Sequence, residues 1–362
     1  MTKTLMVMAG GTGGHVYPAM AVADELMSRG WQVVWLCTEG GMENRLIANK
    51  PYKKAMMTMK GVRGKGVMGW LTLPAKLFTA FKQAHQAMQQ FMPDLVLGMG
   101  GFAAFPGGVM ARLQGLPLVI HEQNSVAGLT NKTLRLIADK TLAAFPSAFG
   151  KKATLVGNPV REAITDVSAP EARFSKKSGA LNILVVGGSL GAQALNEVLP
   201  KAFDEIAKTM AIQVVHQAGE KHIEMLKEQY QNVGYTVEPK AFIEDMAAMY
   251  AWADVVICRA GALTVAELSA AGVASVLVPF PFAVDDHQTG NAKYLSDAGA
   301  AILIQQTALS VEKAVDMLKS LTREQCLAMA KKARALGKSQ ATKEVADVCE
   351  AIALCHKEHH EA

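Results

Sequence analysis

Residues 5–15 read LMVMAGGTGGH, and the fold class follows from them. The apolar run 5–9 predicts a buried strand, and the glycines after it allow a tight turn in which the backbone can approach a ligand closely. A helical pattern continues from about Tyr17 to Arg29. A strand, a glycine turn and a helix in succession are typical of open α/β sheets, and the N–H groups at such a helix start attract phosphate.

The same arrangement recurs about 180 residues later, where residues 181–191 read LNILVVGGSLG and a helix follows to about residue 207. Further strands are predicted near residues 32–37, 94–98, 117–121, 140–144 and 154–156, and near 212–217, 234–238, 254–258, 274–278 and 300–304. Short β-rich runs that alternate with helices predict parallel, doubly wound sheets. The sequence therefore predicts an α/β protein with two Rossmann-like domains whose strand ends face each other across a cleft.

The expected joint between the domains is Gly157-Asn158-Pro159-Val160-Arg161, directly after the last strand of the first half. We expect an N-terminal domain over residues 1–160 and a C-terminal domain over 161–338. Residues 339–362 are expected to form a helix that packs back on the N-terminal domain.

Composition excludes several classes of protein. Of 362 residues, 50% are hydrophobic and 19% are charged, which excludes intrinsic disorder. Five Cys without a C-x-x-C spacing argue against a disulfide framework or a zinc site. The start resembles no signal peptide, and glycines interrupt each long uncharged stretch, so we expect a soluble protein.

Charge is distributed unevenly along the chain. Residues 1–160 hold 17 Lys and Arg against 7 Asp and Glu, a net charge of +10, whereas the remainder carries −5. A basic first half indicates an anionic partner for that half, and an ordinary solvated basic surface is the alternative interpretation.

The first glycine turn matches neither common nucleotide motif. Val16 stands where a dinucleotide fingerprint needs Gly or Ala, and no Gly-Lys-Ser/Thr follows as in a Walker A loop. His15 stands at the helix entrance, where an imidazole suits a general base. The alternative is a histidine that only caps the turn.

Other polar motifs follow strand ends. Gly98-Met99-Gly100-Gly101 is a third glycine loop, and His121-Glu122-Gln123-Asn124 follows the strand at 117–121. Polar side chains are costly to bury unless they bind something, which favours a functional role; Asn124 as a helix cap is the alternative.

In the second half, residues 259–267 read RAGALTVAE, which predicts a turn at Gly261 and a helix start aimed at a phosphate. The Glu267 carboxylate could accept hydrogen bonds from a ribose diol, or it could simply complement the helix dipole. Asp285, Asp286 and His287 could be metal ligands, but no further carboxylates accompany them, so we expect no metal.

Taken in order, these motifs resemble the MurG family of bacterial peptidoglycan glycosyltransferases, which add N-acetylglucosamine (GlcNAc) to lipid I. The resemblance spans essentially the whole chain. It implies a GT-B fold, with the acceptor in the first domain and UDP-GlcNAc held mainly by the second. It further implies an inverting transfer to the 4-hydroxyl of the N-acetylmuramyl unit of lipid I, which gives lipid II and UDP without a cofactor.

The resemblance also implies site residues. The chemistry of an inverting transfer itself requires a base, for which an imidazole is suited, so we expect His15 in that role; Arg161 or Arg259, with the helix-start N–H groups, would stabilise the departing diphosphate. The donor site is expected to comprise Thr12, Gly13, Gly14, Asn124, Arg161, Ser189, Ile243, Ala262, Leu263, Thr264, Val265, Ala266, Glu267 and Gln288.

Three alternatives remain open at this stage. One is another GT-B lipid glycosyltransferase, such as a diacylglycerol galactosyltransferase, and another is a nucleotide-sugar-binding regulator without turnover. The third, an NAD-dependent dehydrogenase, is disfavoured by Val16 and by the lack of an acidic residue after the strand at 32–37.

An anchored acceptor requires docking on an anionic membrane, so we expect a peripheral protein at the cytoplasmic face of the bacterial inner membrane, with other cell-wall synthesis proteins as further partners and no nucleic acid. Trp70, Leu73, Leu77 and Phe81 recur at helical spacing, and basic side chains accompany them, at Lys65, Lys76 and Lys82. An apolar face ringed by Lys is the pattern of an interfacial helix, and an ordinary core helix is the alternative.

Overall fold

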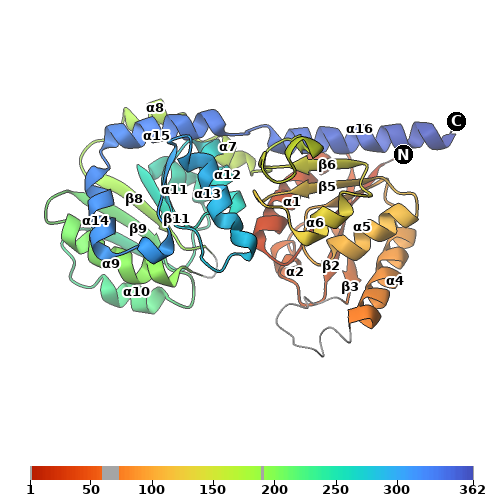
Figure 1. Cartoon of the computed structure of the whole chain (residues 1–362), viewed down its shortest axis with the longest axis horizontal. Helices are drawn as coiled ribbons and strands as arrows, with labels where there is room; N and C mark the ends of the chain where they lie inside the picture. Colours follow the sequence, from red (N-terminus) through yellow and green to blue (C-terminus); the bar gives the residue numbers. More distant parts are fainter. Residues whose placement is uncertain (1, 59–72, 189–190, 362) are drawn as a thin grey trace. The chain divides into compact units, whose positions relative to one another are not determined.

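The computed structural model describes residues 2–58, 73–188 and 191–361, and the chain divides into two compact units (Figure 1). Unit 1 comprises Met1–Arg161 together with Gln340–Ala362, and unit 2 comprises Glu162–Ser339. Each unit holds one parallel sheet with helices on both faces.

The sheet of unit 1 has strand order β3-β2-β1-β4-β5-β6-β7, and all its neighbours pair in parallel. The strands are β1 (Thr4–Met8), β2 (Gln32–Thr38), β3 (Lys53–Met57), β4 (Leu95–Gly98), β5 (Leu118–Glu122), β6 (Lys140–Ala143) and β7 (Thr154–Leu155). The central strands are buried because helices cover both faces, which explains their continuous apolar runs.

The helices of unit 1 are α1 (Gly13–Ser28), α2 (Met42–Leu46), α4 (Leu73–Phe91), α5 (Ala104–Leu113), α6 (Leu129–Leu134) and α16 (Ala341–Glu361), with a 3₁₀ turn at Gly150–Lys152. The last helix, α16, packs on α1 and buries Val345 and Cys349 in the same core as β1 and β2. Arg29 at the end of α1 joins the two helices, since its guanidinium contacts Asp347 at 2.6 Å and Glu350 at 2.8 Å.

The sheet of unit 2 has strand order β10-β9-β8-β11-β12-β13, again entirely parallel. The strands are β8 (Leu181–Val186), β9 (Ile212–Gln217), β10 (Thr236–Lys240), β11 (Val255–Cys258), β12 (Ala274–Leu277) and β13 (Ala301–Leu303). The helices are α7 (Glu162–Thr165), α8 (Pro170–Phe174), α9 (Gln193–Ile206), α10 (Ile223–Gln229), α11 (Met246–Trp252), α12 (Ala262–Ala271), α13 (His287–Ser296), α14 (Val311–Ser320) and α15 (Arg323–Leu336), with 3₁₀ turns at Val284–Asp286 and Gln306–Ala308.

The two doubly wound parallel sheets confirm the predicted fold class. One strand, β3, was not predicted, because its sequence KKAMM carries two exposed lysines and it lies at the edge of the sheet. In each sheet the strand order reverses beside the first strand, between β1 and β4 and between β8 and β11. Ligands of open α/β sheets bind at such switch points, outside the carboxyl ends of the strands.

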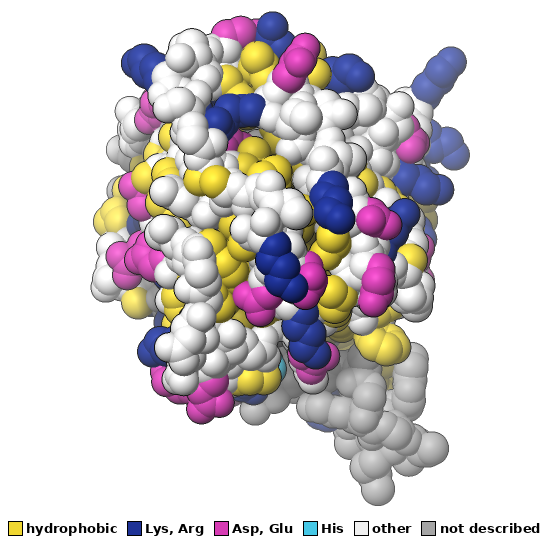
Figure 2. All heavy atoms as spheres, turned by 90° about the vertical axis from the view of Figure 1, so that its left-hand side faces the viewer, with side chains coloured by type: hydrophobic (Ala, Val, Ile, Leu, Met, Phe, Trp, Pro, Cys, Tyr) yellow, Lys and Arg dark blue, Asp and Glu magenta, His cyan; other side chains and the backbone are white. Residues whose placement is uncertain are grey.

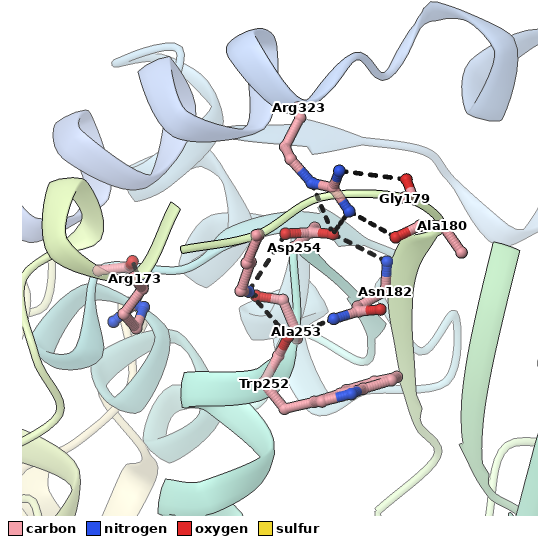
Figure 3. Close-up of polar contacts among 10 residues, drawn as sticks. Arg173, Gly179, Ala180, Asn182, Trp252, Ala253, Asp254 and Arg323 are labelled. Atoms are coloured by element: carbon pink, nitrogen blue, oxygen red, sulfur yellow. Dashed lines mark hydrogen bonds and ion pairs between the residues drawn. The ribbon is translucent and has the colours of Figure 1, made fainter. Parts of the chain in front are cut away.

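Asp254, immediately before β11, is the centre of a buried charge cluster at the opposite, amino-terminal end of the strands of unit 2 (Figure 3). Its carboxylate contacts Lys177 at 3.1 Å and Arg323 at 3.1 Å, and accepts from the Asn182 backbone N–H at 2.8 Å. Arg323 also donates to the carbonyls of Gly179 and Ala180. This cluster ties β8, β11 and α15 together at the amino-terminal ends of the strands, away from the carboxyl ends that form the switch point, so its role is structural.

Candidate active site

The glycine turn of unit 1 lies at the switch point of its sheet. Gly11 adopts a φ of +84°, which a residue with a side chain rarely adopts, and Thr12 is the N-cap of α1 with its carbonyl accepting from His15 N at 3.1 Å. The first turn of α1 contains no acidic side chain. The helix start therefore presents backbone N–H groups and the positive end of the helix dipole, as an anion site requires.

His15 lies between the loops that follow β1 and β4. Its Nδ1 is 3.0 Å from the Gly10 carbonyl oxygen, and a Cβ at Gly100 would lie 3.0 Å from its Nε2. Because a carbonyl oxygen only accepts, Nδ1 carries the proton in the neutral ring, and Nε2 carries the lone pair. The ring thus holds the turn through Nδ1, while Nε2 lies against the loop that contains Gly100.

The motif His121-Glu122-Gln123-Asn124 mostly holds its own loop together. His121 donates from Nε2 to the Gly157 carbonyl at 2.8 Å, and burial lowers the pKa of His121 to about 4, so the ring is neutral at pH 7. Its Nδ1 accepts from Gln123 at 3.2 Å.

The Glu122 carboxylate accepts from Asn124 N at 3.0 Å, Gly128 N at 3.1 Å and Asn131 Nδ2 at 2.9 Å. Three of the four motif side chains are buried, and only Asn124 is half-exposed. The alternative interpretation of Asn124 as a helix cap is wrong, because Gly128 is the N-cap of α6.

Arg161, at the end of unit 1, lies over the ring of Tyr17 in α1, with its guanidinium carbon 5.7 Å from the ring centre. This contact places Arg161 beside the first turns of α1. Those turns directly follow the glycine turn in the sequence.

The glycine loop of unit 2 is built around two residues in the left-handed region. Gly188 has a φ of +81° and Gly191 a φ of +78°, and a Cβ at Gly191 would lie 2.2 Å from the Ala218 carbonyl. Gln217 donates to the Gly188 carbonyl at 3.3 Å and so supports the loop from the end of β9. Ser189 lies outside the described residues.

The segment after β11 forms the second side of this switch point. Gly261 is the N-cap of α12, and the side chains of Ala262 and Val265 are buried, so these two residues present only backbone to a ligand. Leu263, Thr264 and Ala266 are half-exposed.

Glu267 lies in the second turn of α12 and is 6% exposed. Its carboxylate accepts from the Tyr250 hydroxyl at 3.0 Å. The first turn of α12 contains no acidic residue, so the interpretation of Glu267 as a first-turn dipole partner is wrong. Tyr250 itself was missed from the sequence, because nothing in the pattern of α11 distinguishes a tyrosine that bonds a carboxylate from one that only fills the core.

Arg259 holds the loop that follows β12. Its guanidinium donates to the carbonyls of Val278 at 3.2 Å and Pro279 at 3.3 Å and to Gln306 Oε1 at 2.6 Å, and burial lowers the pKa of Arg259. Gln288 supports the same loop, since its Oε1 accepts from Phe280 N at 2.9 Å.

Unit 2 also holds one further predicted donor residue, Ile243, and the possible metal ligands. Ile243 lies in the segment that connects β10 to α11, and its side chain is buried. Asp286 accepts from Thr289 at 2.7 Å, and His287 Nδ1 contacts the Val284 carbonyl at 2.7 Å. Within residues 2–58, 73–188 and 191–361, no group of three or more His, Cys, Asp or Glu side chains is placed to hold a metal ion.

The predicted docking helix is described only from Leu73 onward, in α4; Lys65 and Trp70 lie outside the described residues. Leu73 is half-buried. Leu77 packs on the sheet core, and Phe81 contacts the ring of Phe105.

Lys76 and Lys82 are exposed, and so is Phe78, at 73%. The large apolar side chain that α4 exposes is therefore Phe78 rather than Leu77 or Phe81. In the described part of the chain, no helix is both long and apolar enough to span a bilayer.

Comparison with known proteins accounts for both units. Residues 5–143 match the glycosyltransferase family 28 N-terminal domain, and residues 182–349 match its C-terminal domain. With two doubly wound parallel sheets, these matches define a glycosyltransferase of GT-B fold.

Similar full-length proteins narrow the class. The UDP-N-acetylglucosamine--N-acetylmuramyl-(pentapeptide) pyrophosphoryl-undecaprenol N-acetylglucosamine transferase of Dechloromonas aromatica is 54% identical, over 98% of this chain and all of that one. The protein of the same name from an Azoarcus species is 55% identical, over 97% and 98%. The crystal structure of Acinetobacter baumannii MurG matches with a TM-score of 0.86 and 43% identity, over 96% of this chain and 99% of that one. The chain belongs to the MurG family of N-acetylglucosaminyltransferases.

Proposed function

We propose that this enzyme transfers GlcNAc from UDP-GlcNAc to the N-acetylmuramyl unit of lipid I, which yields lipid II and UDP for peptidoglycan synthesis. The observation that carries the proposal is full-length identity above 50% to transferases named for this reaction. Glycine turns at both switch points support it, because each offers backbone N–H groups to an anionic substrate.

In the proposed mechanism His15 is the general base. Its Nε2 takes the proton from the 4-hydroxyl of the N-acetylmuramyl sugar as that oxygen attacks the anomeric carbon of GlcNAc. The bond from that carbon to the UDP oxygen breaks, with inversion, and the electron pair leaves on the diphosphate. The start of α12, with Arg161 or Arg259, would stabilise this charge.

We assign the donor mainly to unit 2. Glu267 would accept hydrogen bonds from the ribose hydroxyls, and the residues from Ala262 to Ala266 would line the nucleotide. Thr12, Gly13, Gly14 and Asn124 would contribute from unit 1. Ser189, Ile243 and Gln288 would complete the donor site.

The test of the mechanism is release of UDP from UDP-GlcNAc with and without a lipid I analogue. His15→Ala should lower turnover by about a hundredfold or more and leave UDP affinity intact, because the base acts on the acceptor. Near-normal turnover of the variant would reject His15 as the base. UDP release that does not depend on the acceptor would reject the transfer itself.

We further propose that unit 1 docks on the anionic cytoplasmic face of the inner membrane through α4. Phe78 and Lys82 are four residues apart on one helix face, and both are exposed. Lys76 adds a second exposed cation at the start of the helix. The face of unit 2 in Figure 2 instead shows Lys and Arg interspersed with Asp and Glu.

Vesicle binding tests this docking surface. Each basic residue near an anionic leaflet contributes about 1 kcal/mol, so Lys76→Glu with Lys82→Glu should weaken binding to anionic vesicles by at least about 30-fold. Lys201→Glu with Lys313→Glu makes the same charge change on exposed lysines of unit 2 and should have little effect. Equal loss in both pairs would reject α4 as the docking surface.

A further inference from the structure

Glu43 is a buried carboxylate that the mechanism above does not use. It lies in α2, directly after β2, and is 0% exposed. Its Oε1 accepts from the Thr38 backbone N–H at 2.8 Å and from the Thr38 hydroxyl at 2.5 Å. Its Oε2 has no hydrogen-bond partner among the described residues. Burial of a carboxylate with one oxygen unpaired is costly, so the position calls for an explanation.

The unpaired oxygen points at the glycine turn. A Cβ on Gly10 would lie 3.0 Å from Glu43 Oε2, and the three atoms nearest to that Cβ all belong to the Glu43 carboxylate. Gly10 does not have a positive φ, so its backbone conformation does not require glycine. A side chain at this position would therefore have to displace the Glu43 carboxylate.

Gly10 is confined from the other side as well. A Cβ on Gly101, in the loop after β4, would lie 2.5 Å from the Gly10 carbonyl oxygen. That same oxygen accepts from His15 Nδ1 at 3.0 Å. Gly10 therefore packs against both the Glu43 carboxylate and the backbone at Gly101, and its carbonyl is the group that His15 Nδ1 contacts.

We propose that Glu43 is a positioning residue for His15 and acts through Gly10. Thr38 fixes the carboxylate with two hydrogen bonds, and Gly10 packs against that carboxylate. The Gly10 carbonyl in turn holds Nδ1 of the imidazole, which leaves the lone pair on Nε2. This inference rests on the proposed role of His15 as the base.

The first experiment compares Glu43→Ala with the conservative variant Glu43→Gln in the lipid I analogue assay. Glu43→Ala should lower kcat by about 10- to 100-fold, as displacement of a catalytic group does, while the UDP affinity stays unchanged. Glu43→Gln keeps the shape and the acceptor for Thr38, and should retain most of the rate. Because Glu43→Ala could fail to fold, Thr38→Val provides a second variant of matched volume, which loosens the carboxylate and should lower kcat with the same sparing of UDP affinity.

Two double variants separate positioning from general stability. Glu43→Ala should cost no further rate in a His15→Ala background, because it acts only through that ring. Gly10→Ala should slow the wild type but be tolerated in the Glu43→Ala background, where the clashing oxygens are gone.

The outcomes distinguish this inference from the proposed mechanism. If His15→Ala turns over normally, the base assignment fails and this inference fails with it. If His15→Ala is slow and Glu43→Ala multiplies that loss, the base assignment stands and the positioning role of Glu43 is overturned. Normal kcat in both Glu43→Ala and Thr38→Val would also overturn it.

Discussion

Replacement of Glu267 by Gln isolates the charge at the proposed ribose site. Glu267 is only 6% exposed, so truncation to Ala would leave a cavity beside Tyr250 and mix packing with binding. Gln keeps the volume, and its amide oxygen can still accept from the Tyr250 hydroxyl, which lies 3.0 Å from the carboxylate in the wild type. What the substitution removes is the negative charge that the ribose hydroxyls would meet.

The magnitude follows from the number of hydrogen bonds. A hydrogen bond to a charged group contributes about 1.5–3 kcal/mol and one to a neutral group about 1 kcal/mol, so each ribose hydroxyl loses about 1 kcal/mol. Two hydroxyls lose about 2 kcal/mol, which weakens the UDP affinity by about 30-fold.

Calorimetry with UDP and 2′-deoxy-UDP measures the effect directly. The wild type should prefer UDP over the deoxy ligand, and Glu267→Gln should reduce both the affinity and that preference. Glu312→Gln, which neutralises an exposed carboxylate of unit 2, should change neither. An unchanged UDP affinity in Glu267→Gln, or a full preference for UDP in the variant, would refute the assignment of Glu267 to the ribose.

The remaining predictions concern the metal, the buried charge cluster and pH. Transfer should survive an excess of chelator, because helix starts and arginine are proposed to carry the diphosphate; loss of activity that magnesium or manganese restores would contradict this. Asp254→Asn should lower the free energy of unfolding by about 2–4 kcal/mol, because it leaves Lys177 and Arg323 without their buried partner, and it should leave the rate per folded molecule unchanged. Burial lowers the pKa of His121 to about 4 and that of His216 to about 3, so below the ordinary value of 6.5 the unfolded chain binds more protons than the folded one. Stability in urea should therefore fall as the pH drops from 6.5 toward 4, and a constant value over that interval would reject this account.

Most strands could be predicted from the sequence because the strands of a doubly wound sheet are buried on both faces and therefore appear as continuous apolar runs. The apolar run that begins residues 181–191 coincides with β8 (Leu181–Val186), and the predicted strand at 212–217 coincides with β9. β3 escaped prediction because an edge strand buries only part of its surface: Ala55 and Met57 are buried, whereas Lys53 and Lys54 are exposed. The sequence KKAMM alternates between buried and exposed residues from Ala55 onward, as a strand does, but its two adjacent lysines are more typical of a loop.

The amphipathic stripe of α4 shows a limit of periodicity. Leu77 and Phe81 recur at helical spacing; Leu77 packs on the core of unit 1, and Phe81 contacts the ring of Phe105 in α5. An apolar stripe identifies the helix face that is shielded from water, but it does not show whether protein or lipid covers that face. The position of Phe78 on the exposed face required the fold.

The site residues that could not be predicted from the sequence are defined by tertiary contacts. The glycine turns could be found from the sequence because glycine is required by local geometry there, as at Gly11 and Gly188. Glu43 and Tyr250 act on residues that other strands and helices bring to them, so no local pattern marks them.

The motif at 121–124 shows how a sound premise led to an incomplete interpretation. Polar side chains after a buried strand do need partners, but the partners of His121 and Glu122 come from their own unit. His121 uses both ring nitrogens, one toward the Gly157 carbonyl and one toward Gln123, and this requires the neutral ring that its low pKa provides. The motif therefore fixes the end of β5 against the segment that leads to Arg161. Its contribution to the proposed donor site is to hold Asn124 in place, with the buried histidine as a structural support.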